Sequence, residues 1–180
     1  MKSERGTAVI EFALGFMVIL LIAIGAYELG TAFVDRNAMA NAAREGARAG
    51  SAAGEYDDTS SGGINADCVV IEAAAGALQG MEGNDVRELW IFESDPNGTV
   101  GDAQKYRRPL TGDTVDLECA GGLWNRYSNA WPPSERDLGS EQWLGVKLIV
   151  DHTWKTGFAM WNGTTTWEED VVMRLEPAPS

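Results

Sequence analysis

Residues 5–12 read Arg5-Gly6-Thr7-Ala8-Val9-Ile10-Glu11-Phe12, and a long apolar run continues behind them. Gly6 separates a short charged leader from about twenty apolar residues, the length that crosses a bilayer as a helix. Glu11 is the one charge within this run. A carboxylate inside a membrane helix is energetically costly and marks a functional site by default. The stretch therefore predicts a membrane-inserted helix with a functional carboxylate near its start.

The order of Gly6, Glu11 and Phe12 ahead of an apolar helix resembles the processing site of type IV pilin-like precursors. The resemblance implies that residues 1–6 are a leader and that a membrane prepilin peptidase cuts between Gly6 and Thr7. It also implies that Glu11, with Phe12 beside it, serves the registry of subunits in a filament. An ordinary signal anchor with Glu11 reaching to the interface is the alternative.

Charges on the two sides of the apolar run differ in sign. Lys2 and Arg5 precede it, and Glu28 and Asp35 follow it. The positive-inside rule then places the N-terminus in the cytoplasm and the rest of the chain outside, anchored as a single pass in the inner membrane.

Residues 7–53 contain no proline and read as one continuous helix. At 1.5 Å per residue this helix would be roughly 70 Å long, so only its first part, 7–28, is needed to span the membrane or a filament core. In the second part, Ala38, Ala42, Gly46 and Gly50 recur every four residues. Such a stripe of small residues predicts a surface that another backbone approaches closely.

A second segment of this helix, Ala42-Ala43-Arg44-Glu45-Gly46-Ala47-Arg48, strengthens the resemblance. Together with the Glu11-Phe12 start it is similar to the TadE/TadF-like pseudopilins of tight-adherence (Flp) pili. Residues 172–177, Val-Met-Arg-Leu-Glu-Pro, also resemble the end of TadE-like chains. The length of this chain, 180 residues, points to a minor pilin or assembly factor rather than a short major subunit, and a large major subunit is the alternative.

The pattern of expected helices and strands within residues 54–180 predicts an extracytoplasmic α+β domain. After a polar loop, apolar residues at helical spacing indicate a short second helix over about 64–79. Alternation of period two then indicates strands within 86–92, 114–119, 142–154 and 167–176. We expect an antiparallel sheet packed on the second half of the long helix, which is a pilin-like architecture.

Between these strands, residues 120–140 read as a long loop. It contains Trp131 beside two prolines, and a second tryptophan, Trp161, lies in a Gly/Asn/Thr-rich turn. We expect both to be more exposed than the other tryptophans. Exposed loop aromatics can bind a partner or a sugar, although packing under the loops is the more ordinary role.

The chain lacks the material for most catalytic or metal sites. It has one histidine and two cysteines, and no nucleophile, phosphate-loop or dinucleotide motif occurs. The formal charge of −13 repels nucleic acid. We therefore expect no enzyme activity, no metal, no cofactor and no nucleic-acid partner, and we expect His152 to be structural because it shares a strand face with Val150 and Trp154.

Residues 95–102 carry oxygen-bearing side chains at several positions but lack the spacing of an EF-hand loop. Calcium binding is an open alternative to a plain hairpin turn. Asn97-Gly98-Thr99 and Asn162-Gly163-Thr164 fit the glycosylation pattern, and they equally fit Asn-Gly turns.

The two cysteines are predicted to form a disulfide. Cys68 is in step with Ile64 and Ile71 on the apolar stripe of the second helix, and Cys119 is in step with apolar residues of its strand. Both sulfurs are thus aimed into one core, in a compartment where disulfides persist. A pair of buried free thiols is the alternative.

These features together predict a minor pilin or pseudopilin. Its expected partners are the prepilin peptidase, the membrane, other pilin subunits and the pilus assembly machinery, and its expected destination is an extracellular Tad/Flp-type pilus. The alternative is a single-pass, membrane-anchored binding protein that resembles an adhesin.

Overall fold

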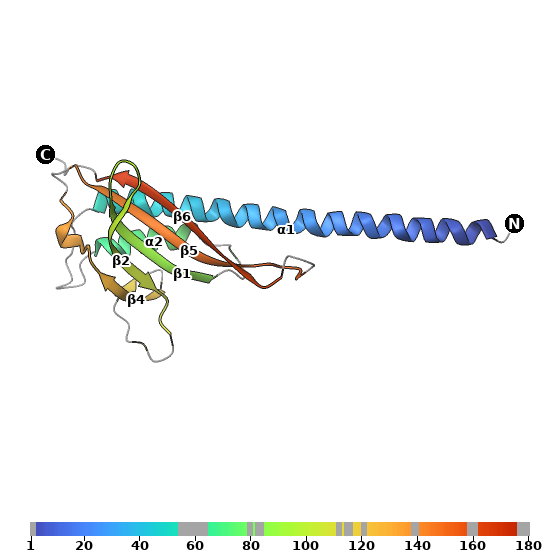
Figure 1. The fold of residues 1–180 in the computed structure, drawn as a ribbon. Helices are drawn as coiled ribbons and strands as arrows, with labels where there is room; N and C mark the ends of the chain where they lie inside the picture. Colours follow the sequence, from blue (N-terminus) through green and yellow to red (C-terminus); the bar gives the residue numbers. More distant parts are fainter. Residues whose placement is uncertain are drawn as a thin grey trace.

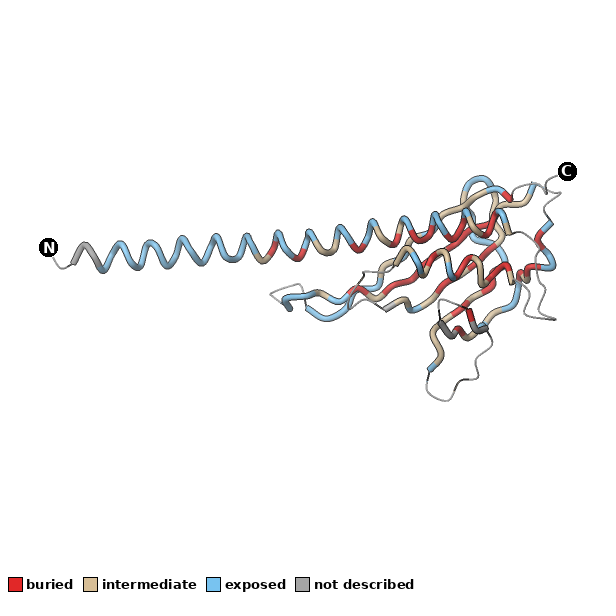
Figure 2. Tube along the Cα trace, turned by 180° about the vertical axis from the view of Figure 1, so that it is seen from behind, coloured by how far each residue is buried: buried red, intermediate tan, exposed pale blue. Residues whose placement is uncertain are grey.

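Helix α1, Ser3–Ala53, is a single helix of 51 residues that projects far beyond the rest of the chain (Figure 1). At 1.5 Å per residue it is about 75 Å long. It begins four residues before the predicted start at Thr7, because residues 3–6 contain no proline and continue the helical hydrogen-bonding ladder. Figure 2 shows that its N-terminal half is exposed all round, whereas buried positions recur along its C-terminal half.

The structure is a computed structural model that describes residues 3–53, 65–78, 81, 85–110, 113, 117–119, 122–137, 141–157 and 162–175. Several sequence-based expectations fall outside these residues. They are the polar loop over 54–63, the first half of the strand expected at 114–119, the exposure of Trp161, and the end of the chain from residue 176.

Helix α2, Ala66–Ala77, is the predicted short second helix, slightly shorter at both ends. Asn65 caps its N-terminus, where Oδ1 accepts hydrogen bonds from the backbone N–H groups of Asp67 at 2.8 Å and Cys68 at 3.3 Å. These bonds satisfy two donors that an uncapped helix leaves without partners. Its buried residues Val70, Ile71 and Ala74 join the core, and α2 packs along α1.

In the described part of the chain, six antiparallel strands form one sheet in the order β3-β4-β2-β1-β5-β6. The strands are β1 Asp85–Ser94, β2 Val100–Arg107, β3 Leu117–Cys119, β4 Gly122–Asn129, β5 Trp143–Thr153 and β6 Thr164–Arg174. α1 packs against β5 and β6 (Figure 1), and α2 contacts α1 and β3. The predicted α+β fold, with an antiparallel sheet against the second half of the long helix, is confirmed.

The expectation of a long loop over 120–140 is wrong. β4 lies within it and pairs with β2, and a short 3-10 helix, η1, follows at Pro133–Glu135. β2 itself lies over residues for which the sequence predicted no strand. The alternation in β4 is hard to recognise, because the pairing shifts register between Lys105–Ser128 and Tyr106–Arg126 and leaves Tyr127 as an extra residue.

The expected exposure of Trp131 is also wrong, since only 2% of this residue is accessible. Its ring lies 4.8 Å from the guanidinium carbon of Arg136, and its carbonyl accepts a hydrogen bond from Nη2 of Arg136 at 3.3 Å. The side chain of Arg136, which follows the two prolines, therefore packs on the indole.

The turn between β1 and β2 is closed by the side chain of Asp95. Its Oδ1 accepts from the backbone N–H groups of Asn97 and Thr99, both at 2.9 Å, and its Oδ2 accepts from the hydroxyl of Thr99 at 3.1 Å. Gly98 follows with φ of 85°, a value that favours glycine. These bonds support the hairpin-turn interpretation of this stretch.

Among the described residues, sixteen buried side chains form one core cluster, drawn from both helices and from all strands except β6. They are Ala42, Ala43, Ala47, Val70, Ile71, Ala74, Leu89, Ile91, Tyr106, Cys119, Trp124, Trp131, Leu144, Val146, Leu148 and Leu175. The first core residue of α1, Ala42, thus lies in the last quarter of the helix, and the apolar window near the N-terminus of α1 is not buried against any described residue.

Candidate functional site

The residues of the predicted processing motif lie in the first turns of α1. Gly6 is exposed, and a Cβ built on it would meet no atom within 4 Å. Thr7 and Glu11 are both exposed and are four residues apart, which places them on the same helix face. Phe12 is 72% exposed, and its ring stacks on that of Phe16 with centroids 6.0 Å apart.

The apolar run is exposed from Ala8 to Ala23, and burial begins at its end, at Ile24 and Gly25. Its large exposed side chains are Val9, Ile10, Phe12, Leu14, Phe16, Met17, Val18, Ile19, Leu20, Leu21 and Ile22. A contiguous apolar surface of this size marks contact with a membrane or with other protein. α1 is long and apolar enough to cross a membrane, and its apolar window is not buried against any described residue.

The stripe of small residues lies on the face of α1 that packs within the same chain. Ala42 is fully buried, and a Cβ on Gly46 would come within 3.3 Å of Cγ1 of Val146. A Cβ on Gly50 would come within 2.7 Å of Cγ2 of Val70. Ala38, at the N-terminal end of the stripe, is only half-buried. The stripe therefore packs against side chains of α2 and β5, and no backbone of another described element is among the atoms nearest to it.

Glu28, expected from the sequence only as a charge that flanks the apolar run, is a buried carboxylate. It lies directly after the apolar run and receives the far end of the β5–β6 hairpin. Its Oε2 accepts from the backbone N–H of Lys155 at 3.2 Å, and its Oε1 accepts from the backbone N–H of Thr156. The sequence signal that could have pointed to Glu28 is its position, because it is the first charged residue after the apolar run.

Asp35 lies two turns further along the same face of α1 and contacts the same hairpin. Its Oδ2 is 3.1 Å from Nδ1 of the fully buried His152. The imidazole stacks on Trp167 at 4.1 Å between centroids and meets the ring of Trp154 edge-on at 4.8 Å. Burial lowers the pKa of His152 from its ordinary value, against the opposing effect of the Asp35 carboxylate. The environment is that of a packed structural histidine.

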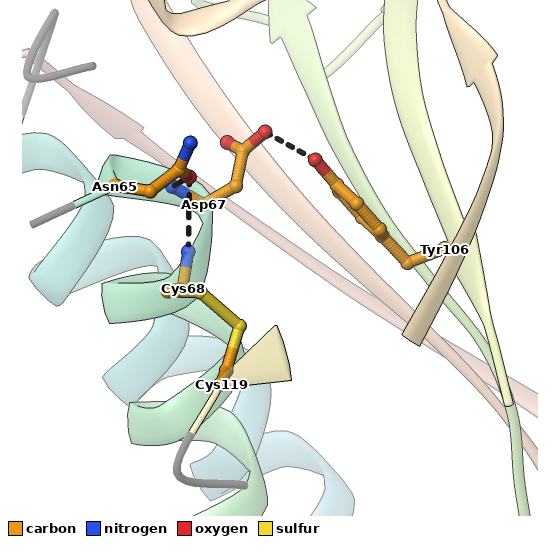
Figure 3. Close-up of a disulfide and its surroundings, with 5 residues drawn as sticks. All are labelled: Asn65, Asp67, Cys68, Tyr106 and Cys119. Carbon is orange, nitrogen blue, oxygen red and sulfur yellow. Dashed lines mark hydrogen bonds between the residues drawn. A yellow bond between two sulfur atoms is a disulfide. The ribbon is translucent and has the colours of Figure 1, made fainter. Parts of the chain in front are cut away.

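The disulfide between Cys68 and Cys119 joins α2 to the end of β3. Figure 3 shows the bond beside Asp67, whose carboxylate points across to the hydroxyl of Tyr106. The two Cα atoms are 5.4 Å apart, well within the range that a disulfide spans. The prediction that these cysteines pair is confirmed.

Asp67 is the centre of a buried polar network that the sequence did not reveal. The hydroxyl of Tyr106 donates to its Oδ2 at 2.5 Å, and Nη2 of Arg136 lies 2.6 Å from its Oδ1. All three side chains are almost completely inaccessible. The network connects α2, β2 and the segment after η1, so its role is to hold the domain together.

The described tryptophans offer little exposed aromatic surface. Trp124 and Trp131 are buried, and Trp90, Trp143, Trp154 and Trp167 are half-buried. The indole N–H of Trp90 is already bonded to Glu88 at 2.8 Å and to the Tyr127 hydroxyl at 3.1 Å. Among the described residues, no group of three His, Cys, Asp or Glu side chains could hold a metal ion.

Comparison with known protein families matches residues 6–48 to the model of the TadE-like proteins. The matched segment begins at the predicted cleavage residue and includes Glu11, the apolar run and most of the small-residue stripe. Most of α1 is thus similar to a pilus-associated family. Neither curated proteins nor solved structures gave a significant match to the chain.

Proposed function

We propose that the chain is a minor pilin or pseudopilin of a Tad-type pilus, held in the inner membrane by α1 before it enters the filament. The observation that carries this proposal is the exposed apolar half of α1, which begins with the Gly6-Thr7-Glu11-Phe12 motif and matches the TadE-like family over residues 6–48. A helix with this exposure is unstable in water and requires lipid or neighbouring helices around it.

Processing would occur between Gly6 and Thr7 by a prepilin peptidase. The open space around Gly6 means that the chain's own packing does not require glycine there. The requirement for a small residue would then come from the peptidase. Processing would also place a new ammonium group on Thr7, on the same helix face as Glu11.

Glu11 would pair with the Thr7 ammonium of its own or a neighbouring subunit. An unpaired carboxylate in an apolar filament core costs several kcal/mol, so subunits in the correct register are favoured over those that leave it unpaired. The small-residue stripe at Ala38, Ala42, Gly46 and Gly50 would contribute to packing within the subunit rather than between subunits, as its contacts with α2 suggest.

Intact-mass measurement tests the processing step. In cells with the pilus machinery, we expect wild-type protein to begin at Thr7 and Gly6→Leu to retain residues 1–6. The matched control is Gly15→Leu, since Gly15 is also an α1 glycine without neighbours within 4 Å. Mature mass from Gly6→Leu, or an unprocessed wild-type chain, contradicts the proposal.

Recovery in sheared filaments tests the role of Glu11. We expect Glu11→Ala to be processed and folded but depleted from filaments, while Glu45→Ala, which removes an exposed α1 glutamate paired with Arg48, is incorporated normally. Normal incorporation of Glu11→Ala contradicts the registry role. The alternative of a membrane-anchored binding protein predicts that full-length wild-type chain stays in the membrane fraction.

A further inference from the structure

The β5–β6 hairpin extends along α1 toward the N-terminus, and its far end reaches the border of the apolar run (Figure 1). Lys155 and Thr156 donate their backbone N–H groups to Glu28, which fixes this end of the hairpin at one level of the helix. Glu28 is separated from Lys155 and Thr156 by 127 and 128 positions in the sequence. Their contact lies outside the main core of the domain.

The level of Glu28 corresponds to the surface of a bilayer. The twenty residues from Ala8 to Tyr27 would cover about 30 Å as a helix, which is the thickness of the hydrocarbon core. Glu28 and the hairpin end bonded to it then lie in the adjoining headgroup layer. Tyr27 is 57% exposed at the same level, as expected for an aromatic residue at a membrane interface.

The charge distribution at this end of the domain also suits a lipid surface. The chain as a whole is strongly acidic, yet Glu28 and Asp35 are buried here. Among the described residues of 26–35, 153–157 and 162–165, Lys155 carries the only exposed charge. An exposed lysine beside Tyr27 and Trp154 matches the pattern of interfacial anchors, in which the aromatic rings and the ammonium lie among headgroups.

We propose that the far end of the β5–β6 hairpin, residues 153–157 and 162–165, binds the lipid headgroup layer of the membrane that α1 crosses. Glu28 is the positioning residue of this surface, because its carboxylate holds the hairpin end at headgroup depth. This inference rests on the proposed membrane insertion of α1. It adds that the globular domain lies on the outer surface of the bilayer in a fixed orientation before filament assembly.

Depth-dependent fluorescence quenching tests the proposal in the full chain, reconstituted in vesicles of phosphatidylcholine and phosphatidylglycerol. A single added cysteine carries the fluorophore, since Cys68 and Cys119 are paired. Thr164→Cys places it on the exposed hairpin end, and Asn97→Cys places it on the exposed β1–β2 turn at the opposite end of the sheet. Val18→Cys reports on the apolar run, where Val18 is exposed.

Headgroup-attached nitroxide lipids should quench the probe at position 164 at least about threefold more than the probe at position 97, and acyl-chain nitroxides should quench the probe at position 18. Equal, weak quenching at 164 and 97 with strong quenching at 18 overturns the hairpin contact and leaves the membrane insertion intact. Absence of quenching at 18 contradicts the insertion of α1, and with it the proposed function.

Glu28→Ala, combined with the probe at position 164, tests the positioning role. Loss of the acceptor for two backbone N–H groups should reduce headgroup quenching to near the level seen at position 97. Glu45→Ala, on an exposed face of the same helix, should leave quenching unchanged. Undiminished quenching in Glu28→Ala overturns the role of Glu28. The comparison of the probes at positions 164 and 97 is made in chains that keep Glu28, so it does not depend on how the Glu28→Ala variant folds.

Discussion

Gly50 of α1 lies so close to Val70 of α2 that a Cβ on Gly50 would be 2.7 Å from Cγ2 of Val70 and 3.0 Å from Cδ2 of Leu144. Real Cβ atoms do not approach this closely, so the side chains of two other elements must move to admit even one methyl group. The spacing between α1, α2 and the sheet is thus set by a glycine at this point.

Replacing Gly50 by alanine tests this contact against the intrinsic preference of helices for alanine. The same substitution at Gly76, a helical position of α2 with no atom within 4 Å of the added Cβ, should raise the free energy of unfolding by up to about 1 kcal/mol. At Gly50, overpacking of about 1–3 kcal/mol opposes that gain. We expect Gly50→Ala to be less stable than Gly76→Ala by at least about 1 kcal/mol, as measured by chemical denaturation in detergent. Equal stabilities of the two variants would contradict the close packing at Gly50.

The disulfide closes a loop between cysteines 51 residues apart. In the chain-entropy description, this constraint on the unfolded chain is worth about 4 kcal/mol. We expect Cys68→Ala, Cys119→Ala and the double variant to lose similar amounts of stability, because any one of them opens the same loop. Thiol labelling of denatured, unreduced wild-type protein should find no reactive cysteine, and two reactive cysteines would refute the bond.

The Arg136–Asp67 pair is completely buried, with Nη2 and Oδ1 2.6 Å apart. Removing one partner leaves an uncompensated charge, so we expect Arg136→Met to cost about 3–5 kcal/mol of unfolding free energy. Arg174→Met, which breaks the exposed pair between Arg174 and Glu141, should cost at most about 1 kcal/mol. A comparable effect of both substitutions in a denaturation experiment would show that Arg136 is not buried against Asp67.

Tyr127 should ionise late in an alkaline titration. Partial burial, followed by the hydrogen bond to the Glu88 carboxylate, raises its pKa from 10.0 to about 12. Since the folded state holds the phenol proton more tightly than the unfolded chain, the stability from neutral Tyr127 is present below pH 10 and is lost as the pH rises toward about 12. The phenolate absorbance of wild type minus that of Tyr127→Phe should show a midpoint near 12. A midpoint at the ordinary value would mean that the bond to Glu88 is absent in solution.

Local patterns in the sequence were sufficient to predict features whose contacts are near in the chain, or whose residues recur with the period of a helix or strand. The absence of proline predicted α1, helical spacing predicted α2, and the two apolar periodicities that contain Cys68 and Cys119 predicted the disulfide. Strands β5 and β6 were predicted because polar and apolar side chains alternate over most of their length, whereas Leu89–Phe92 of β1 is a continuous apolar run. These signals are local, since a helix or strand with one apolar face must bury that face wherever it packs.

Only the tertiary structure determined which polar groups meet. The bonds from the β5–β6 hairpin to Glu28, and from Tyr106 and Arg136 to Asp67, join residues far apart in sequence, and no periodicity encodes such pairs. β4 escaped prediction because its shifted register with β2 interrupts the alternation, and the burial of Trp131 depends on an arginine that comes after the prolines. The sequence thus determined both helices and the strands with a clear local pattern, while β2, β4 and the directional contacts of buried polar groups required the packed chain, because each such group must find a specific partner in three dimensions.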